Sequence, residues 1–359
     1  MKIGLVMIVK NEEAVIQRAL QSAKPFISTY LIVDTGSTDN TKKIIANIMS
    51  DVSGVVVDRP WVSFGHNRSE ALALCDKRMD WAIMLDADDS LGGTVPPPSV
   101  WQTDVDAFMI SCIHGTTRHQ RTQIFRMDIG WAYEGPVHEY AVCRSKAAVL
   151  AVLPPETHMI TRCEGSRSKN PKKYINDAQL LEKELLAKPD DHRTLFYLAQ
   201  SYRDADMPEK AQQYYKRNID ISGGWEQERY MSLVNLIILE KDDNERRRLT
   251  WQAIGVCPER LDAQYTYLKM HRSADLVPTQ ETFAIASFTK GRKIEASDLF
   301  VTPYIYEMGM DDELAIVAFK TEHYREAYEA STRCMMVAPE PMRSVALKNA
   351  QTAYLQITK

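Results

Sequence analysis

The sequence lacks any apolar run long enough to cross a membrane. Its longest run near the start covers residues 3–9, whereas a membrane helix needs about 18 or more apolar residues. No basic stretch followed by a cleavable apolar segment stands at the start, so secretion is not indicated. The 6 cysteines are scattered and form no CxxC pair, which argues against a zinc knuckle or a disulfide framework. We therefore expect a reduced, cytoplasmic protein without a membrane span.

The sequence also has little excess charge of either sign. Lys and Arg number 44 and Asp and Glu number 48, which leaves a net charge of −4. This charge argues against a protein that coats nucleic acid without sequence preference. With 45% hydrophobic and 26% charged residues, the composition is that of a globular protein. At roughly 150 residues per domain, a chain of 359 residues is expected to form two domains.

Several familiar catalytic patterns are absent. No GxGxxG follows the first predicted strand and no GxxxxGK[ST] occurs, which excludes a dinucleotide fingerprint and a P-loop. No GxSxG elbow or paired Cys/His motif is present, so the sequence offers no standard enzymic nucleophile.

The first ninety residues alternate between strand-like and helix-like patterns. Apolar runs predict four strands, at residues 2–9, 30–33, 55–57 and 81–85. Between them, amphipathic patterns predict helices through Ile16 and Leu20, through Ile44 and Ile48, and over residues 67–78. Such alternation is typical of a doubly wound, mostly parallel α/β sheet.

The second half of the chain reads as helical repeats. Leu198, Ala199, Tyr202, Pro208, Ala211 and Tyr215 have the spacing of a 34-residue tetratricopeptide unit, and a similar pattern runs from Ala315 to Pro339. A generic helical bundle is the alternative. The basic, turn-rich stretch before Lys173 marks the change, so we predict one domain over residues 1–168 and a helical repeat domain over residues 169–359.

Acidic residues follow two of the predicted strands. Asp86-Ala87-Asp88-Asp89 comes directly after the fourth strand, and Asp34 ends the second. Ligands of open parallel sheets bind beyond the carboxyl ends of the strands. Carboxylates there could bind Mg²⁺ or Mn²⁺ together with substrate phosphates, although an isolated acidic turn more often only caps a helix. Asp34 could accept a hydrogen bond from a nucleobase.

Together these motifs resemble a known family. Residues 7–13 (MIVKNEE), 32–41 (IVDTGSTDNT) and 85–89 (LDADD) resemble family 2 glycosyltransferases of the GT-A fold. Residues 61–68 (WVSFGHNR), 135–139 (GPVHE) and 223–228 (GGWEQE) look like the branch with a C-terminal tetratricopeptide domain. The resemblance implies a Rossmann-like GT-A catalytic domain followed by an all-α tetratricopeptide-like domain.

The resemblance also implies roles for individual residues. Asp34 would bind the base, and Asn11 and Glu12 would flank the nucleotide. Asp86 would lie near the ribose and Asp88 would ligate Mn²⁺ or Mg²⁺. His158 would be a second metal ligand, with His138 as its alternative, and Glu139 would be the general base, with Asp89 next in line. Apart from the resemblance, the position of Arg68 at a helix start suggests a phosphate contact or a pair with Glu70 or Asp34.

The function implied is inverting transfer of a sugar from a nucleotide-diphosphate sugar, with a UDP-sugar as the expected donor. The acceptor would be macromolecular, because helical repeats offer extended surfaces. A protein or peptide, a glycan and a hydroxylated DNA base all stay open, as does an oligomer formed through the helical domain. The alternative is a non-enzymatic repeat scaffold whose glycosyltransferase domain has decayed.

Overall fold

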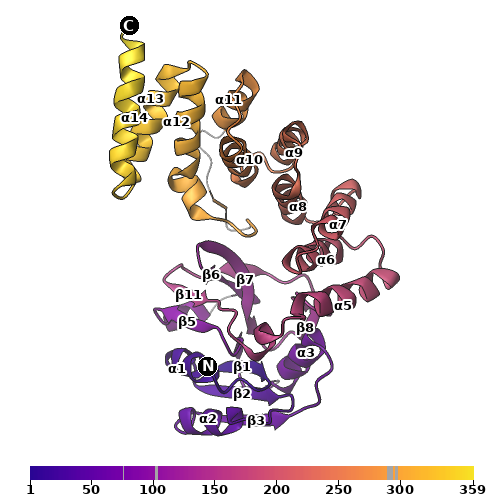
Figure 1. Ribbon diagram of the computed structural model, residues 1–359. Helices are drawn as coiled ribbons and strands as arrows, with labels where there is room; N and C mark the ends of the chain where they lie inside the picture. The colour runs from indigo at the N-terminus through magenta and orange to yellow at the C-terminus, as the bar shows by residue number, and fades with distance from the viewer. Residues whose placement is uncertain (76, 102–103, 289–293, 296–297) are drawn as a thin grey trace. The chain divides into compact units, whose positions relative to one another are not determined.

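The computed structural model describes residues 1–359 except 76, 102–103, 289–293 and 296–297. The chain divides into two compact units, Met1–Ala187 and Lys188–Lys359. The first holds the strands and the second is helical, in agreement with the expected fold class (Figure 1). Helix α5 (Lys173–Ala187) groups with the first unit. The boundary after residue 168 stays a prediction.

Among the described residues, nine strands of the first unit form one sheet. They are β1 (Ile3–Val9), β2 (Thr29–Asp34), β3 (Ser53–Asp58), β4 (Trp81–Met84), β5 (Ser90–Gly93), β6 (Ala107–His114), β7 (Thr117–Arg126), β10 (Leu150–Val152) and β11 (Thr157–Ile160). Strands β1 to β4 are mutually parallel, as the sequence predicts, and they lie in the order β3-β2-β1-β4. Beyond β4 the sheet is mixed, because β7 runs antiparallel to both β4 and β6, and β5 runs antiparallel to β11.

Helices cover both faces of the parallel half of the sheet. On one face, Leu5 and Met7 of β1 pack with α1 (Ile16–Ala23) and α2 (Thr41–Ile48). On the other face, Val6 packs with α3 (Phe64–Leu74). Successive side chains of a strand point to opposite faces, so burial on both sides explains the unbroken apolar sequence of β1. A two-stranded ribbon, β8 (Trp131–Glu134) with β9 (Tyr140–Cys143), lies against α3, where the backbone N–H of Tyr133 donates to Ser69 Oγ at 2.8 Å.

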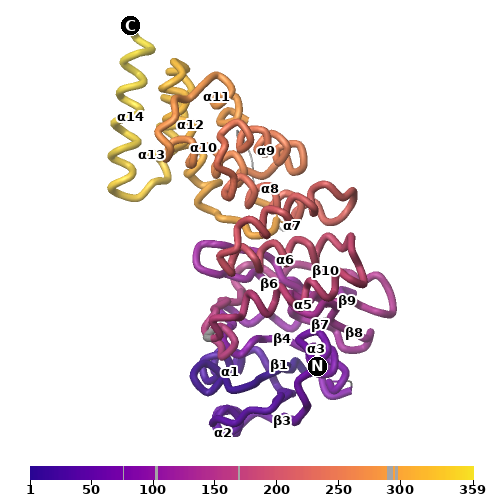
Figure 2. Tube along the Cα trace, turned by 45° about the vertical axis from the view of Figure 1, so that its right-hand side comes forward, coloured from indigo at the N-terminus to yellow at the C-terminus, as the bar shows by residue number. Residues whose placement is uncertain are grey.

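The second unit consists of helices that follow one another in pairs (Figure 2). Those described are α6 (His192–Asp204), α7 (Pro208–Asp220), α8 (Glu226–Leu239), α9 (Asp243–Val256), α10 (Asp262–Ser273), α11 (Gln280–Ser287), α12 (Met310–Lys320), α13 (Tyr324–Val337) and α14 (Met342–Ile357), with a π-helical turn at Ile305–Gly309. Pro208 begins α7, and the repeat residues Ala199, Ala211 and Tyr215 are fully buried. The repeat pattern predicts that these positions are buried between helices, with the two alanines permitting close helix contacts, and the burial agrees with it.

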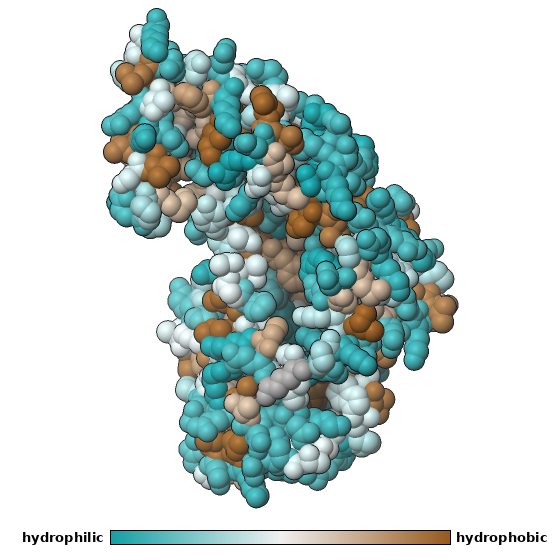
Figure 3. Space-filling model, viewed as in Figure 1, coloured by the Kyte–Doolittle hydropathy of each residue, from teal (hydrophilic) through white to brown (hydrophobic). Residues whose placement is uncertain are grey.

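Hydrophilic side chains dominate the face of the molecule in Figure 3, with hydrophobic residues scattered among them. Several exposed apolar residues belong to α13 and α14, for example Met336 and Leu355. Across the described helices, none combines the length and the apolar character that a bilayer crossing requires.

Candidate active site

Asp34 stands at the carboxyl end of β2 and is fully buried. Its Oδ1 accepts the backbone N–H groups of Gly36 at 2.9 Å and Ser37 at 2.7 Å. Gly36 has φ +105°, a conformation that glycine adopts without strain, so this residue type closes the turn. The second oxygen, Oδ2, is buried and has no hydrogen-bond partner among the described residues. Asp34 is thus held rigidly and retains one acceptor for a donor group of a ligand.

The turn after β1 is tied to the turn after β2. Asn11, with φ +56°, accepts the backbone N–H of Thr38 on its Oδ1 at 2.7 Å. Its own N–H donates to Ser37 Oγ at 3.0 Å, and the N–H of Glu12 donates to Thr41 Oγ1 at 2.8 Å. Asn11 and Glu12 therefore lie beside the turn that Asp34 begins, where the family resemblance expects the nucleotide.

Three carboxylates follow β4 within one short turn. Asp86 is ion-paired with Arg68 of α3, whereas Asp89 is buried and accepts the N–H of Arg162 at 3.0 Å. Burial alone would raise the pKa of Asp86, but the charge of Arg68, and next that of Arg121, outweighs it and lowers this pKa. Burial, with repulsion from Asp86, raises the pKa of Asp89 to about 7. The turn therefore holds carboxylates of unlike proton affinity.

Asp88 lies in the middle of this turn and is bound by backbone. Its Oδ2 accepts the N–H groups of Glu164 at 3.0 Å and Gly165 at 2.9 Å. Glu12 is nearby, because its carboxylate accepts the N–H of Ser166 at 3.1 Å. Burial, and to a smaller extent the charge of Asp88, raises the pKa of Glu12, although its bonds from Ser166 oppose this. Two carboxylates from the ends of β1 and β4 thus meet the same segment of chain.

Arg68 joins Asp86 to Glu139. Its Nε lies 2.6 Å from Glu139 Oε1, and its side chain is 5% exposed against 8% for that of Glu139. Glu139 follows the turn between β8 and β9, in which Gly135 has φ +102° and His138 has φ +53°. Helix α3 approaches this turn so closely that a Cβ on Gly65 would lie 2.7 Å from the carbonyl oxygen of Gly135. The predicted contact of Arg68 with Glu70 is not seen, since Glu70 pairs with Arg59 at 2.9 Å.

The structure does not bring His158 beside Asp88. His158 lies on β11 opposite Gly92, the third residue of β5, and its ring packs against that glycine. His138 lies in the turn before Glu139 and its side chain is exposed. Among the described residues, no group of three His, Cys, Asp or Glu side chains is arranged to hold a metal ion. Neither histidine assignment has support from the geometry, and both stay predictions.

Two residues at this site lie outside the motifs that carry the family resemblance. Arg121 of β7 is close enough to Asp86 for its charge to affect the pKa of that carboxyl. Tyr133 of β8 lies with its ring centroid 5.6 Å from the Arg68 guanidinium. Its hydroxyl is buried without a hydrogen-bond partner among the described residues. Both residues come from the less regular part of the sheet, where neighbours in space are far apart in sequence.

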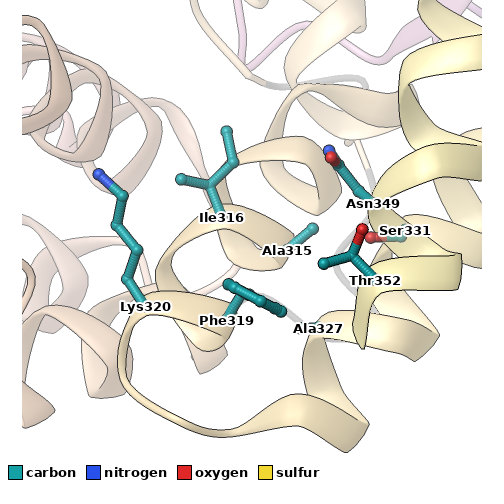
Figure 4. A pocket seen from close by; sticks show the side chains of 8 residues that line it. All are labelled: Ala315, Ile316, Phe319, Lys320, Ala327, Ser331, Asn349 and Thr352. Carbon is teal, nitrogen blue, oxygen red and sulfur yellow. The ribbon is translucent and has the colours of Figure 1, made fainter. Parts of the chain in front are cut away.

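The helical unit has a cavity of about 160 Å³ between α12, α13 and α14 (Figure 4). The cavity is lined by Ala315, Ile316, Phe319, Lys320, Ala327, Ser331, Asn349 and Thr352. Lys320 is the single charged residue of this lining, so the cavity has no acid or base pair for catalysis. The carboxylates of the candidate site described above all belong to the first unit.

Residues 5–93 match the family model described as Glycosyl transferase family 2. This segment includes Asp34, Arg68 and the Asp86–Asp89 turn but not Glu139 or His158. The match confirms that this region resembles the glycosyltransferases of family 2.

Curated relatives agree over a similar length. An uncharacterized glycosyltransferase of Rickettsia typhi is 36% identical over 90 residues, which cover 25% of this chain and 29% of the relative. A TPR repeat-containing protein of Synechococcus elongatus is 31% identical over 91 residues, covering 25% of this chain and 21% of that protein. The match therefore spans less than a third of the length of these relatives.

Solved structures are more distant. S. aureus TarS 1-349 superposes with a TM-score of 0.35 at 13% identity, covering 82% of this chain and 93% of that chain. MamA gives a TM-score of 0.32 at 14% identity, covering 52% of this chain and 90% of its own.

Proposed function

We propose that this chain, whose residues 5–93 match glycosyltransferase family 2, is an inverting, metal-dependent glycosyltransferase. It takes a sugar from a nucleotide-diphosphate sugar, a UDP-sugar in the first instance, and passes it to a hydroxyl or other nucleophile of a macromolecular acceptor. The observation that carries the proposal is the position of three carboxylates at the carboxyl edge of the parallel strands: Asp34 ends β2, and Asp86 and Asp88 follow β4, the two strands that flank β1. Ligands of open α/β sheets bind at this edge.

The donor nucleotide would be held by groups that the fold already orients. The unpartnered Oδ2 of Asp34 would accept a hydrogen bond from an N–H group of the nucleobase. Asn11 and Glu12 would flank the nucleotide, because both are bonded to the turn that follows Asp34. Asp86 would accept from the ribose. Arg68, in place of a direct phosphate contact, would fix the position of Asp86 through their ion pair.

A divalent cation, Mn²⁺ or Mg²⁺, suits the carboxylates after β4. Hard cations prefer oxygen ligands, and Asp88, with Glu12 facing the same segment of chain, supplies such oxygens. When bound, the cation would neutralise charge on the departing diphosphate as a Lewis acid. Asp88 is the proposed ligand, and His158 or alternatively His138 stays a proposed addition from the family resemblance.

Glu139 is the proposed general base, which would take the proton from the acceptor nucleophile as the nucleophile attacks. Its ion pair with Arg68 fixes its orientation, so that its position relative to the proposed ribose contact Asp86 is defined. Asp89 is the rival because its pKa is raised to about 7 by burial and by repulsion from Asp86. A single inverting displacement needs one such base and no enzymic nucleophile.

The acceptor would be selected by the helical unit, whose repeats present extended surfaces to a chain-like partner. A direct test is incubation of the full chain with Mn²⁺ and a panel of nucleotide-sugars, followed by assay of released nucleotide and mass spectrometry of peptide, glycan and DNA acceptors. Release of nucleotide from at least one donor is the expected result. Failure with every donor would favour the non-enzymatic scaffold.

A further inference from the structure

The segment at residues 162–168, which we call the strap, closes over the carboxylates that end β1 and β4. It connects β11 to α5 within the first unit (Figure 1). The strap N–H groups of Glu164 and Gly165 donate to Asp88 Oδ2 at 3.0 and 2.9 Å. Ser166 donates to Glu12 twice, from its backbone N–H at 3.1 Å and from its hydroxyl at 3.0 Å.

Gly165 lies between the two carboxylates. A Cβ on this residue would be 3.2 Å from Asp88 Oδ2 and 3.3 Å from Glu12 Oε2. Its φ is −63°, so any residue type could adopt this backbone conformation, and close approach alone favours glycine here. Gly165 is buried, and its backbone fills the space that the two carboxylates share.

Contacts outside the carboxylates hold the strap in place. Arg18 Nη2 lies 2.5 Å from Glu164 Oε2 and 3.1 Å from the carbonyl oxygen of Asp88. The Arg167 guanidinium lies 4.4 Å from the ring centroid of Phe64 and is ion-paired with Asp177 of α5. These contacts can be weakened without changing either carboxylate.

We propose that the strap and a divalent cation compete for the carboxylates of Asp88 and Glu12. This inference rests on the metal dependence in the proposed function and adds Glu12 as a second carboxylate ligand. A Mg²⁺–oxygen bond is about 2.0–2.1 Å, so a cation held by both carboxylates would occupy the space that Gly165 fills. The strap N–H groups supply partial positive charge to the same oxygens. Cation binding therefore requires residues 164–166 to leave, and a docked strap keeps the proposed cation site closed.

Hydrogen exchange tests the competition directly. We expect Mn²⁺ alone, without nucleotide, to speed exchange at the amides of Glu164, Gly165 and Ser166, and Asp88→Asn to abolish this response. Unchanged or slower exchange at these amides while Mn²⁺ binds, as followed by its electron paramagnetic resonance signal, would overturn the competition.

Gly165→Ala provides an independent test because it leaves Asp88 and Glu12 in place. The added methyl group crowds both carboxylates and should loosen the strap. The Mn²⁺ dissociation constant should then fall by about tenfold if 1.4 kcal/mol of strap docking is lost. Glu164→Ala, which removes the Arg18 pair, should shift affinity in the same direction. Gly255→Ala is the matched control, since a Cβ there would meet nothing within 4 Å.

The outcomes separate this inference from the proposed function. Equal or weaker Mn²⁺ binding in both Gly165→Ala and Glu164→Ala, with donor turnover intact in the native chain, contradicts the competition alone. Absence of Mn²⁺ binding in the native chain and in both variants contradicts the competition and metal dependence together. Nucleotide-sugar turnover, measured without added metal, then decides whether glycosyl transfer itself stands.

Discussion

Arg68 and Glu139 form a buried ion pair, with Arg68 Nε 2.6 Å from Glu139 Oε1 and side chains only 5% and 8% exposed. The same guanidinium pairs with Asp86, so one cation links helix α3 to the ends of two separate strand segments. An uncompensated buried charge is costly, and this linkage fixes the distance between the proposed ribose contact and the proposed base.

Replacing Arg68 should therefore lower the stability of the first unit. We expect Arg68→Ala to lower the free energy of unfolding by about 3–5 kcal/mol, because it leaves the buried carboxylate of Glu139 and the partly buried carboxylate of Asp86 without their partner. Arg59→Ala is the control: its partner is Glu70, the pair is about one-third exposed, and such pairs contribute roughly 0–1 kcal/mol. Urea unfolding followed by tryptophan fluorescence measures both. Equal stability of the two variants would show that the linkage is unimportant.

The identity of the general base can be decided by a pair of isosteric variants. Glu139→Gln keeps the shape of the side chain but cannot take a proton, so transfer should fall by about 10²–10⁴-fold while nucleotide binding is kept. Asp89→Asn should have a smaller effect on the rate constant of transfer. Single-turnover kinetics with the identified acceptor gives both numbers. The reverse ranking would move the role to Asp89.

The histidine assignments need a measurement of metal affinity rather than of rate. If His158 is a ligand, His158→Ala should weaken Mn²⁺ binding while His138→Ala leaves it unchanged. Titration of Mn²⁺ followed by electron paramagnetic resonance distinguishes them. An effect in His138→Ala alone would transfer the role, and unchanged affinity in both variants would leave carboxylates as the protein ligands.

Acceptor choice should reside in the helical unit. Trp225, which precedes α8, is 45% exposed, and aromatic residues of this kind contribute strongly to interfaces. We expect Trp225→Ala to weaken transfer to the macromolecular acceptor several-fold while slow hydrolysis of the donor continues unchanged. Leu186→Ala, which removes an exposed apolar residue of α5 in the first unit, is the control. If neither reaction changes in Trp225→Ala, this residue lies outside the acceptor surface.

The parallel half of the sheet could be predicted because its signals are local. Strand β1 is an unbroken apolar run since both of its faces are covered, and the acidic turn after β4 follows directly in sequence. The mixed half could not be predicted in the same way. There β7 pairs with β4 and β6, so its partners depend on contacts between distant segments rather than on a repeating pattern.

The residues of the candidate site divide in the same way into those that the sequence predicts and those that it does not. The sequence marks Asp34, Asp86 and Asp88 through motifs, and the structure places them at the carboxyl ends of β2 and β4, which flank β1. The sequence does not indicate that Arg68 pairs with Glu139, because that contact depends on the β8–β9 turn folding against α3. The hydrogen bonds from the strap to Asp88 come from backbone N–H groups, which every non-proline residue has. No side-chain motif could therefore predict them.

The most direct test of the account is nucleotide-sugar turnover by the full chain and by Asp88→Asn, each with Mn²⁺ and with a chelator. Asn replaces a half-buried carboxylate outside the hydrophobic core by a neutral amide of the same size, so the fold should persist while the cation loses its proposed ligand. We predict that the native chain with Mn²⁺ releases nucleotide from at least one donor, and that both the chelator and the variant abolish release. Turnover that survives both changes would contradict the assignment of Asp88, and absence of turnover under every condition would contradict the proposed glycosyltransferase activity.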